Sequence, residues 1–122
     1  MYEWIDGYCT AKPGVTPEDQ ADWQATRYVV GGKMFAMAGQ NKAGEPIFTV
    51  KLEPKRGEFL REQFAEITPG YYMNKLHWNS VSLGGTIPEE ILKGMIDEGY
   101  AIVFQTLPKK TQREILQREE EK

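Results

Sequence analysis

The chain has few of the residues that disulfide-rich and metal-binding proteins need. It holds one cysteine, Cys9, and one histidine, His77, among 122 residues. A single cysteine excludes a disulfide framework within the chain and indicates a reducing compartment. One histidine and one cysteine far apart in the sequence do not supply the matched ligand spacing of a zinc or iron site. We therefore expect the protein to hold no metal.

Membrane-spanning and catalytic motifs are missing as well. No apolar run approaches the roughly twenty residues that cross a bilayer, and the N-terminus lacks a basic region followed by an apolar stretch. Phosphate-binding loops, dinucleotide fingerprints and nucleophile-elbow motifs are absent. His77 has neither an orienting carboxylate nor a nucleophile close to it in the sequence. We expect a cytoplasmic protein that is not an enzyme, with no cofactor, no catalytic residue and no membrane partner.

Basic residues are in the minority. The chain has 15 Lys and Arg against 18 Asp and Glu, a formal net charge of −3. Proteins that bind by neutralising phosphates usually carry a basic excess. Any basic surface must therefore be local, with acidic residues such as Glu119, Glu120 and Glu121 offsetting it elsewhere.

The length fits a single domain, residues 1–122, with one core of its own. A helix beginning at Tyr2 is predicted to end at Pro13-Gly14, and residues 17–22 are expected to form a polar connection. Three strands follow, over residues 26–30, 33–38 and 46–52, with turns at Gly31-Gly32 and over residues 39–44. This pattern predicts an antiparallel meander.

Alternation in the third predicted strand separates two faces of the sheet. Phe48, Val50 and Leu52 point one way, while Thr49 and Lys51 point the other. One face is therefore predicted to be apolar and the other open to polar contacts. A single core is expected around the large apolar residues Trp23, Phe35, Phe48, Phe64 and Ile96.

The second half of the chain is predicted to be mainly helical. From Pro54, the apolar residues Leu60, Phe64 and Ile67 form one helical stripe, which Pro69-Gly70 ends before extended structure resumes. A capping box at Thr86-Ile-Pro-Glu89 begins another helix, which either ends near Gly99 or continues to Phe104. Pro108 precedes a short final helix, with Ile115 and Leu116 expected to point inward.

This order of elements predicts an α+β fold, an antiparallel β-sheet meander with helices packed on one face.

The run TPGYYMNKLHWNSVSL, from Thr68 to Leu83, combines aromatic, amide, imidazole and ammonium groups. In an extended segment Lys75, His77 and Asn79 share one face, at intervals of roughly 6 to 7 Å. With Trp78 as a stacking ring, this composition is typical of surfaces that hold phosphates and bases. A structural interpretation stays open beside it, in which Trp78 is core, Tyr71 and Tyr72 shape the Pro69-Gly70 turn, and the Asn74 side chain caps that turn.

Four other lysines could join such a surface. Lys33 and Lys51 lie in predicted strands and must either extend to solvent or face a polar surface. Lys109 and Lys110 follow Pro108 at a helix N-terminus, where cations oppose the helix dipole but free backbone N–H groups favour an anion. Simple solubilisation by these lysines is the alternative.

The Thr68–Leu83 run resembles the signature of the MmcQ/YjbR family of small bacterial proteins. The resemblance extends from about Trp23 to Lys110 and includes Gly32-Lys-Met-Phe-Ala36, Phe48-Thr-Val-Lys51, Leu60-Arg-Glu62 and Leu107-Pro-Lys-Lys110. It implies a fold similar to CyaY/frataxin-like domains and DNA binding as the activity. The acidic pairs of this chain are scattered, unlike the clustered carboxylates with which frataxin-like proteins bind iron.

We therefore predict a DNA-binding protein of the MmcQ/YjbR type, binding weakly through phosphate contacts. The alternative is a protein-interaction module that docks a protein partner, and an enzyme ranks third. The nucleic-acid-binding residues predicted from the sequence are Lys33, Lys51, Lys75, His77, Trp78, Asn79, Lys109 and Lys110.

Overall fold

The computed structural model describes residues 3–20, 24–70 and 74–121. The secondary-structure elements, in chain order, are α1 (Trp4–Thr10), β1 (Val15–Gln20), β2 (Ala25–Val30), β3 (Lys33–Gln40), β4 (Pro46–Lys51), α2 (Pro54–Gln63), β5 (Ile67–Pro69), β6 (Trp78–Ser82), α3 (Glu89–Gln105) and α4 (Lys109–Glu120).

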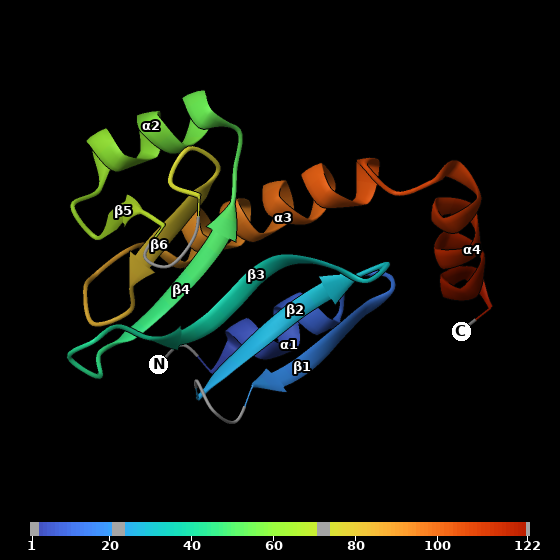
Figure 1. Ribbon diagram of the computed structural model, residues 1–122, viewed down its shortest axis with the longest axis horizontal. Coiled ribbons are helices and arrows are strands. Elements are labelled where there is room, and N and C mark those ends of the chain that lie inside the picture. Colours follow the sequence, from blue (N-terminus) through green and yellow to red (C-terminus); the bar gives the residue numbers. More distant parts are fainter. Residues whose placement is uncertain (1–2, 21–23, 71–73, 122) are drawn as a thin grey trace.

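The strands form one antiparallel sheet in the order β1-β2-β3-β4-β6-β5 (Figure 1). The first four strands are a meander. The chain then passes through α2 to the edge strand β5 and returns as β6 between β5 and β4. The predicted α+β class and the antiparallel meander are confirmed.

The two predicted glycine turns join the strands of the meander. Gly31 and Gly32, with φ of 58° and 81°, join β2 to β3, and Gly44, with φ of 80°, lies between β3 and β4. Residues with a Cβ atom rarely adopt these backbone angles. In the second turn the Asn41 side-chain oxygen accepts hydrogen bonds from the backbone N–H groups of Ala43 and Glu45.

Both edge strands differ from the prediction. The expected polar connection at residues 17–20 is part of β1, which pairs along its whole length with β2. The expected helix up to Pro69 instead ends at Gln63, and Ile67 lies in β5. An edge strand tolerates proline and polar side chains because one of its sides bonds to no other strand, so Pro17 and Pro69 did not exclude strands here.

Helices α1 and α3 lie on one face of the sheet, behind it in Figure 1, and α2 packs near β5. Helix α3 continues through Gly99. A Cβ atom at this glycine would lie 2.6 Å from Val50 Cγ2 and 2.9 Å from the Lys51 carbonyl oxygen. Gly99 therefore permits close packing of α3 on β4 and does not end the helix.

Most of the predicted core is confirmed. Phe35, Phe48 and Ile96 are fully buried in one cluster, and Phe64 is partly buried against it. Trp23 lies outside the described residues. In α4, Ile115 is buried against Gly14, but Leu116 is 47% exposed, so the prediction that both point inward is wrong for Leu116.

The predicted capping box at Thr86 and Glu89 is also wrong. Pro88 precedes α3, and no side chain caps this helix. The Thr86 backbone N–H and hydroxyl instead donate to Glu66 Oε2, at 3.1 and 3.3 Å, and the backbone bond keeps the pKa of the Glu66 carboxyl below its usual value. Thr86 thus joins the loop before α3 to the loop before β5.

Cys9 is fully buried, with no exposed surface. Burial, and secondarily the Asp6 charge, raises the pKa of its thiol to about 12.

Because the thiolate is the reactive form of a cysteine, we expect no reaction of Cys9 in the folded protein with dithionitrobenzoate near pH 8. Full reaction is expected in denaturant, measured by the absorbance of the released thiolate. Stoichiometric reaction of the native protein within minutes would contradict this burial.

Within the described part of the chain, no helix has the length and apolar character needed to cross a membrane.

Candidate nucleic-acid interface

Lys51 and Trp78 are direct cross-strand partners, at the end of β4 and the start of β6. Such partners project from the same face of a sheet with Cβ atoms roughly 5 Å apart. This is the face away from α3, because the next pair, Val50 and Asn79, lies on the side where α3 packs at Gly99. Both Lys51 and Trp78 are half-buried.

Lys75 and His77 lie in a turn, not in the extended segment that was predicted. The Asn74 side chain accepts a hydrogen bond from the Leu76 N–H at 2.8 Å, and the Asn74 carbonyl accepts one from the Trp78 N–H at 3.0 Å. The Asn74 side chain therefore caps the turn over residues 74–77. The turn predicted at Pro69-Gly70 extends into Tyr71 and Tyr72, which lie outside the described residues. The Leu52 N–H donates to the His77 carbonyl at 2.8 Å and fixes the turn beside the end of β4.

These contacts bring together four of the predicted residues, which we call the β4–β6 corner: Lys51, Lys75, His77 and Trp78. Lys75 is exposed and His77 is half-buried. Leu76, between them, is 60% exposed. The corner therefore presents two ammonium groups, an imidazole, an indole and one exposed apolar side chain.

Asn79 does not belong to this surface. It is fully buried, and its register partner Val50 is a core residue. Its side-chain oxygen accepts a hydrogen bond from Arg61 Nη1, and its Nδ2 donates to the His77 carbonyl at 3.4 Å. The prediction that Asn79 shares an exposed face with Lys75 and His77 is wrong, since the strand begins only at Trp78.

Arg61 is the residue that sequence reasoning missed. It projects from α2 and is half-buried, and its guanidinium lies against Gly57 and Asn79. No carboxylate among the described residues forms an ion pair with it. Its only signal in the sequence is its place in the Leu60-Arg61-Glu62 pattern. Through Asn79 and the His77 carbonyl, Arg61 connects α2 to the turn that carries Lys75.

The centre of the sheet face away from α3 is polar but not open. Thr49 and Ser80 are direct partners, 2% and 3% exposed, and their hydroxyl oxygens lie 2.9 Å apart in a hydrogen bond. The Thr68 hydroxyl donates to the Ser80 carbonyl at 3.4 Å. The prediction of a face open to polar contacts therefore holds only at its margin, where Lys51 and Trp78 lie.

Lys33, Lys109 and Lys110 lie elsewhere. Lys33 pairs with the core residue Val30, and its ammonium donates to the Thr106 hydroxyl at 3.3 Å, at the end of α3. Lys109 and Lys110 are exposed at the start of α4, which lies at the opposite end of the molecule from β6 and α2 (Figure 1). The eight predicted residues thus divide among the β4–β6 corner, the core and the α3–α4 junction.

A second group of aromatic and basic side chains joins α1 to α3. The Tyr8 hydroxyl donates to Asp97 Oδ1 at 2.8 Å, and Lys12 Nζ pairs with the same oxygen and lies over the Tyr8 ring, 4.9 Å from its centre. The Asp97 hydrogen bond raises the pKa of Tyr8 to about 12. Because the charges of Lys12 and Asp97 are paired with each other, this group links α1 to α3 and leaves little unpaired charge for a ligand.

A hollow of about 640 Å³ lies near the start of α3. The described residues that line it contain one carboxylate and no basic side chain; they are Trp4, Leu83, Gly84, Gly85, Thr86, Ile87 and Glu89. A phosphate backbone would find no cation there. The β4–β6 corner is therefore the better candidate for nucleic acid.

The sequence of this chain is similar to those of known proteins. The YjbR family model matches residues 10–102. The Escherichia coli K12 protein YjbR is 32% identical over 110 residues, covering 90% of this chain and 92% of that protein. The Escherichia coli O157:H7 protein YbdF is 32% identical over 88 residues, covering 72% of this chain and 71% of that protein.

Solved structures share the fold. The Deinococcus radiodurans protein DR2400, a DUF419 domain, superposes with a TM-score of 0.81 at 28% identity, over 91% of this chain and 84% of that chain. A Pseudomonas syringae protein superposes with a TM-score of 0.70 at 20% identity, over 81% of this chain and 95% of that chain. None of these names states an activity.

Proposed function

The chain belongs to the YjbR family, and on that premise we propose that it binds DNA weakly, through phosphate contacts at the β4–β6 corner. The observation that carries the proposal is the pairing of Lys51 with Trp78 beside a turn that holds Lys75 and His77. A cation next to an aromatic ring can neutralise a phosphate while a neighbouring base stacks.

Each residue of the corner has a role in this proposal. Lys51 and Lys75 contact phosphates, His77 donates a hydrogen bond, and Trp78 stacks on a base or sugar. The turn is held in place from two sides, by the Leu52 N–H and by the Asn79 amide, both bonded to the His77 carbonyl. Arg61 positions Asn79 and contacts no DNA.

The acid excess sets the expected strength of binding. With a net charge of −3, the whole protein does not attract DNA over long distances. The favourable electrostatic energy of binding comes from two local lysines, Lys51 and Lys75. Lys33, Lys109 and Lys110 lie too far along the molecule to extend this one surface (Figure 1). A DNA contact at the α3–α4 junction would be a separate one.

Salt dependence tests the proposal. Two phosphate contacts predict a slope of log affinity against log salt near −2, from about −0.9 per contact. Changing Lys51→Gln and Lys75→Gln together is expected to reduce this slope to near zero and to abolish binding to the duplex at low salt. The measurement is fluorescence anisotropy with a short labelled duplex that holds one protein molecule.

A matched control changes the net charge by the same amount at the opposite end of the molecule. The double variant Lys109→Gln, Lys110→Gln should bind the short duplex as the parent does. We would abandon the proposal if both double variants weakened binding equally, or if the parent did not bind even at low ionic strength.

One observation favours a second function, docking of a protein partner. Leu76 lies between Lys75 and His77 in the turn and is 60% exposed, and a partner that covers this side chain would remove its apolar surface from water. A partner bound through Leu76 would show little dependence on salt, which separates this function from binding to phosphates.

A further inference from the structure

Lysines at the N-terminus of α4 and glutamates at its C-terminus oppose the helix dipole, while Arg118 in the last turn favours it. Lys109 and Lys110 occupy its N-terminus, where the backbone N–H groups already carry positive partial charge. Glu120 and Glu121 lie at its C-terminus, where the carbonyl groups carry negative partial charge. Apart from Arg118, the helix dipole gives no reason for this arrangement of charges, and the lysines and glutamates would each be better matched by a group of opposite charge from outside the helix.

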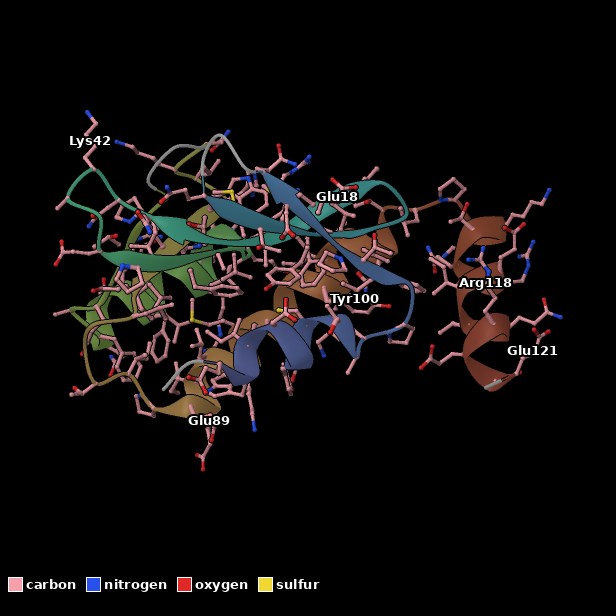
Figure 2. All side chains as sticks on the ribbon, turned by 90° about the horizontal axis from the view of Figure 1, so that it is seen from below. Glu18, Lys42, Glu89, Tyr100, Arg118 and Glu121 are labelled. Carbon is pink, nitrogen blue, oxygen red and sulfur yellow. The ribbon has the colours of Figure 1, made fainter. Side chains whose placement is uncertain are left out.

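Helix α4 is attached to the rest of the protein by one side only. Its inward side consists of the buried Ile115, which packs on Gly14, with Thr111, Gln112 and Glu119 partly covered around it. The Gln112 amide also donates to the Leu107 carbonyl at 2.8 Å. In both views α4 stands at one end of the molecule, apart from the sheet and α3 (Figures 1 and 2).

The opposite side of α4 carries a continuous exposed stripe. Helical spacing places Lys109, Arg113, Leu116 and Glu120 on one side of the helix, and all four are exposed, Leu116 by 47%. The stripe is basic at one end, apolar near the middle and acidic at the other end. Figure 2 shows the acidic end of the helix, marked by Glu121, near its free tip.

We propose that this stripe docks onto the same stripe of a second copy of the chain, with the two α4 helices antiparallel. A two-fold contact places residue i of one helix opposite residue j of the other and j opposite i. Centred between Glu114 and Ile115, the pairing sets Lys109 against Glu120 of the second copy at both ends. It also sets Arg113 against Leu116, so that the aliphatic stem of the arginine covers the exposed leucine.

A second copy fits this stripe better than a different molecule of one charge sign. An anionic partner would be repelled at Glu120 and Glu121, and a cationic partner would be repelled at Lys109 and Arg113. The antiparallel pairing of identical helices matches both ends at once and places a cation at the negative end of each dipole. A surface formed by one short helix is small, so the dimer should be weak and sensitive to salt.

Charge reversal tests the pairing directly. The variant Lys109→Glu, Arg113→Glu makes the whole stripe acidic, and the variant Glu120→Lys, Glu121→Lys makes it basic. The parent is expected to dimerise at about 0.01 M ionic strength and to dissociate at about 0.15 M, as the Debye length falls from about 30 to about 8 Å. Each variant alone should stay monomeric at both salts, and an equimolar mixture should form a heterodimer at low salt.

Sedimentation velocity without DNA gives the readout, and circular dichroism shows whether each variant is folded. Ile115, which holds α4 to the body, is unchanged in both variants. The proposal is overturned if the parent remains monomeric at low salt, if the folded variants do not associate when mixed, or if either variant dimerises alone. Mixing restores association only when surfaces of opposite charge contact each other, so an effect of either variant on folding cannot imitate the expected result.

Discussion

Replacing Phe48 with alanine is expected to lower the free energy of unfolding by about 3 to 5 kcal/mol. Phe48 has no exposed surface, lies in β4 opposite the fully buried Val81, and belongs to the cluster that includes Phe35 and Ile96. Its removal leaves a cavity under a sheet whose neighbouring strands cannot close around it. Urea denaturation followed by tryptophan fluorescence gives the change in the midpoint.

Phe59 supplies the matched control. It is the same residue type, 50% exposed on α2, with its ring 5.8 Å from the Arg56 guanidinium carbon. Phe59→Ala should cost less than about 1 kcal/mol, because little apolar surface is lost and a cation–π contact at an exposed site contributes about 0.5 to 1 kcal/mol. Equal midpoints for the two variants would show that Phe48 is not in the core.

Strands β2 to β4 of the meander were predictable because turn residues separate them and because apolar and polar side chains alternate in β4. Phe48 and Val50 are buried on one side of β4, as their alternation with Thr49 and Lys51 predicts. The edge strands were not predictable in the same way. β1 has one buried residue, Val15, and is otherwise nearly as polar as a loop, and β5 is only three residues long.

The faces of the lysines could not be read from the sequence. Lys33 and Lys51 each lie in a strand. Alternation within a strand shows which of its side chains share a face, but the pairing register decides which face of one strand matches which face of the next. An irregularity between Tyr28 and Val29 shifts the register of β2 against β3. Lys33 therefore points to the helix side, where it reaches Thr106, while Lys51 shares the other face with Trp78.

Buried polar residues are the other limit of sequence reasoning. Asn79, Thr49 and Ser80 have the composition of an exposed polar face, yet each is buried and hydrogen-bonded. What distinguishes such residues from surface residues is a partner far away in the sequence, here Arg61 for Asn79. Hydropathy and spacing contain no information about that partner.

The Asn79 contact leads to a prediction about stability. Asn79→Ala removes the acceptor of Arg61 Nη1 and the donor to the His77 carbonyl, which should lower the free energy of unfolding by about 1 to 3 kcal/mol.

Gly57→Ala alone should also lower the free energy of unfolding, by about 1 to 3 kcal/mol. Its new Cβ atom would lie 2.8 Å from the Asn79 side-chain oxygen and 2.9 Å from Nδ2, both held in place by hydrogen bonds.

The double variant is expected to reverse the sign of the Gly57 substitution. Once Asn79 is alanine, the amide that the new Cβ atom would meet is gone, and only the Arg61 guanidinium, at 3.0 Å, must move at the end of a flexible side chain. Alanine is then favoured over glycine within α2 by up to about 1 kcal/mol. Adding Gly57→Ala to Asn79→Ala should therefore raise the urea midpoint. The coupling energy, which is the difference between the effects of Gly57→Ala in the two backgrounds, should be about 1 to 4 kcal/mol. Additive effects of the two substitutions would mean that the Asn79 amide does not pack against α2 and would return Asn79 to the list of residues available to a ligand.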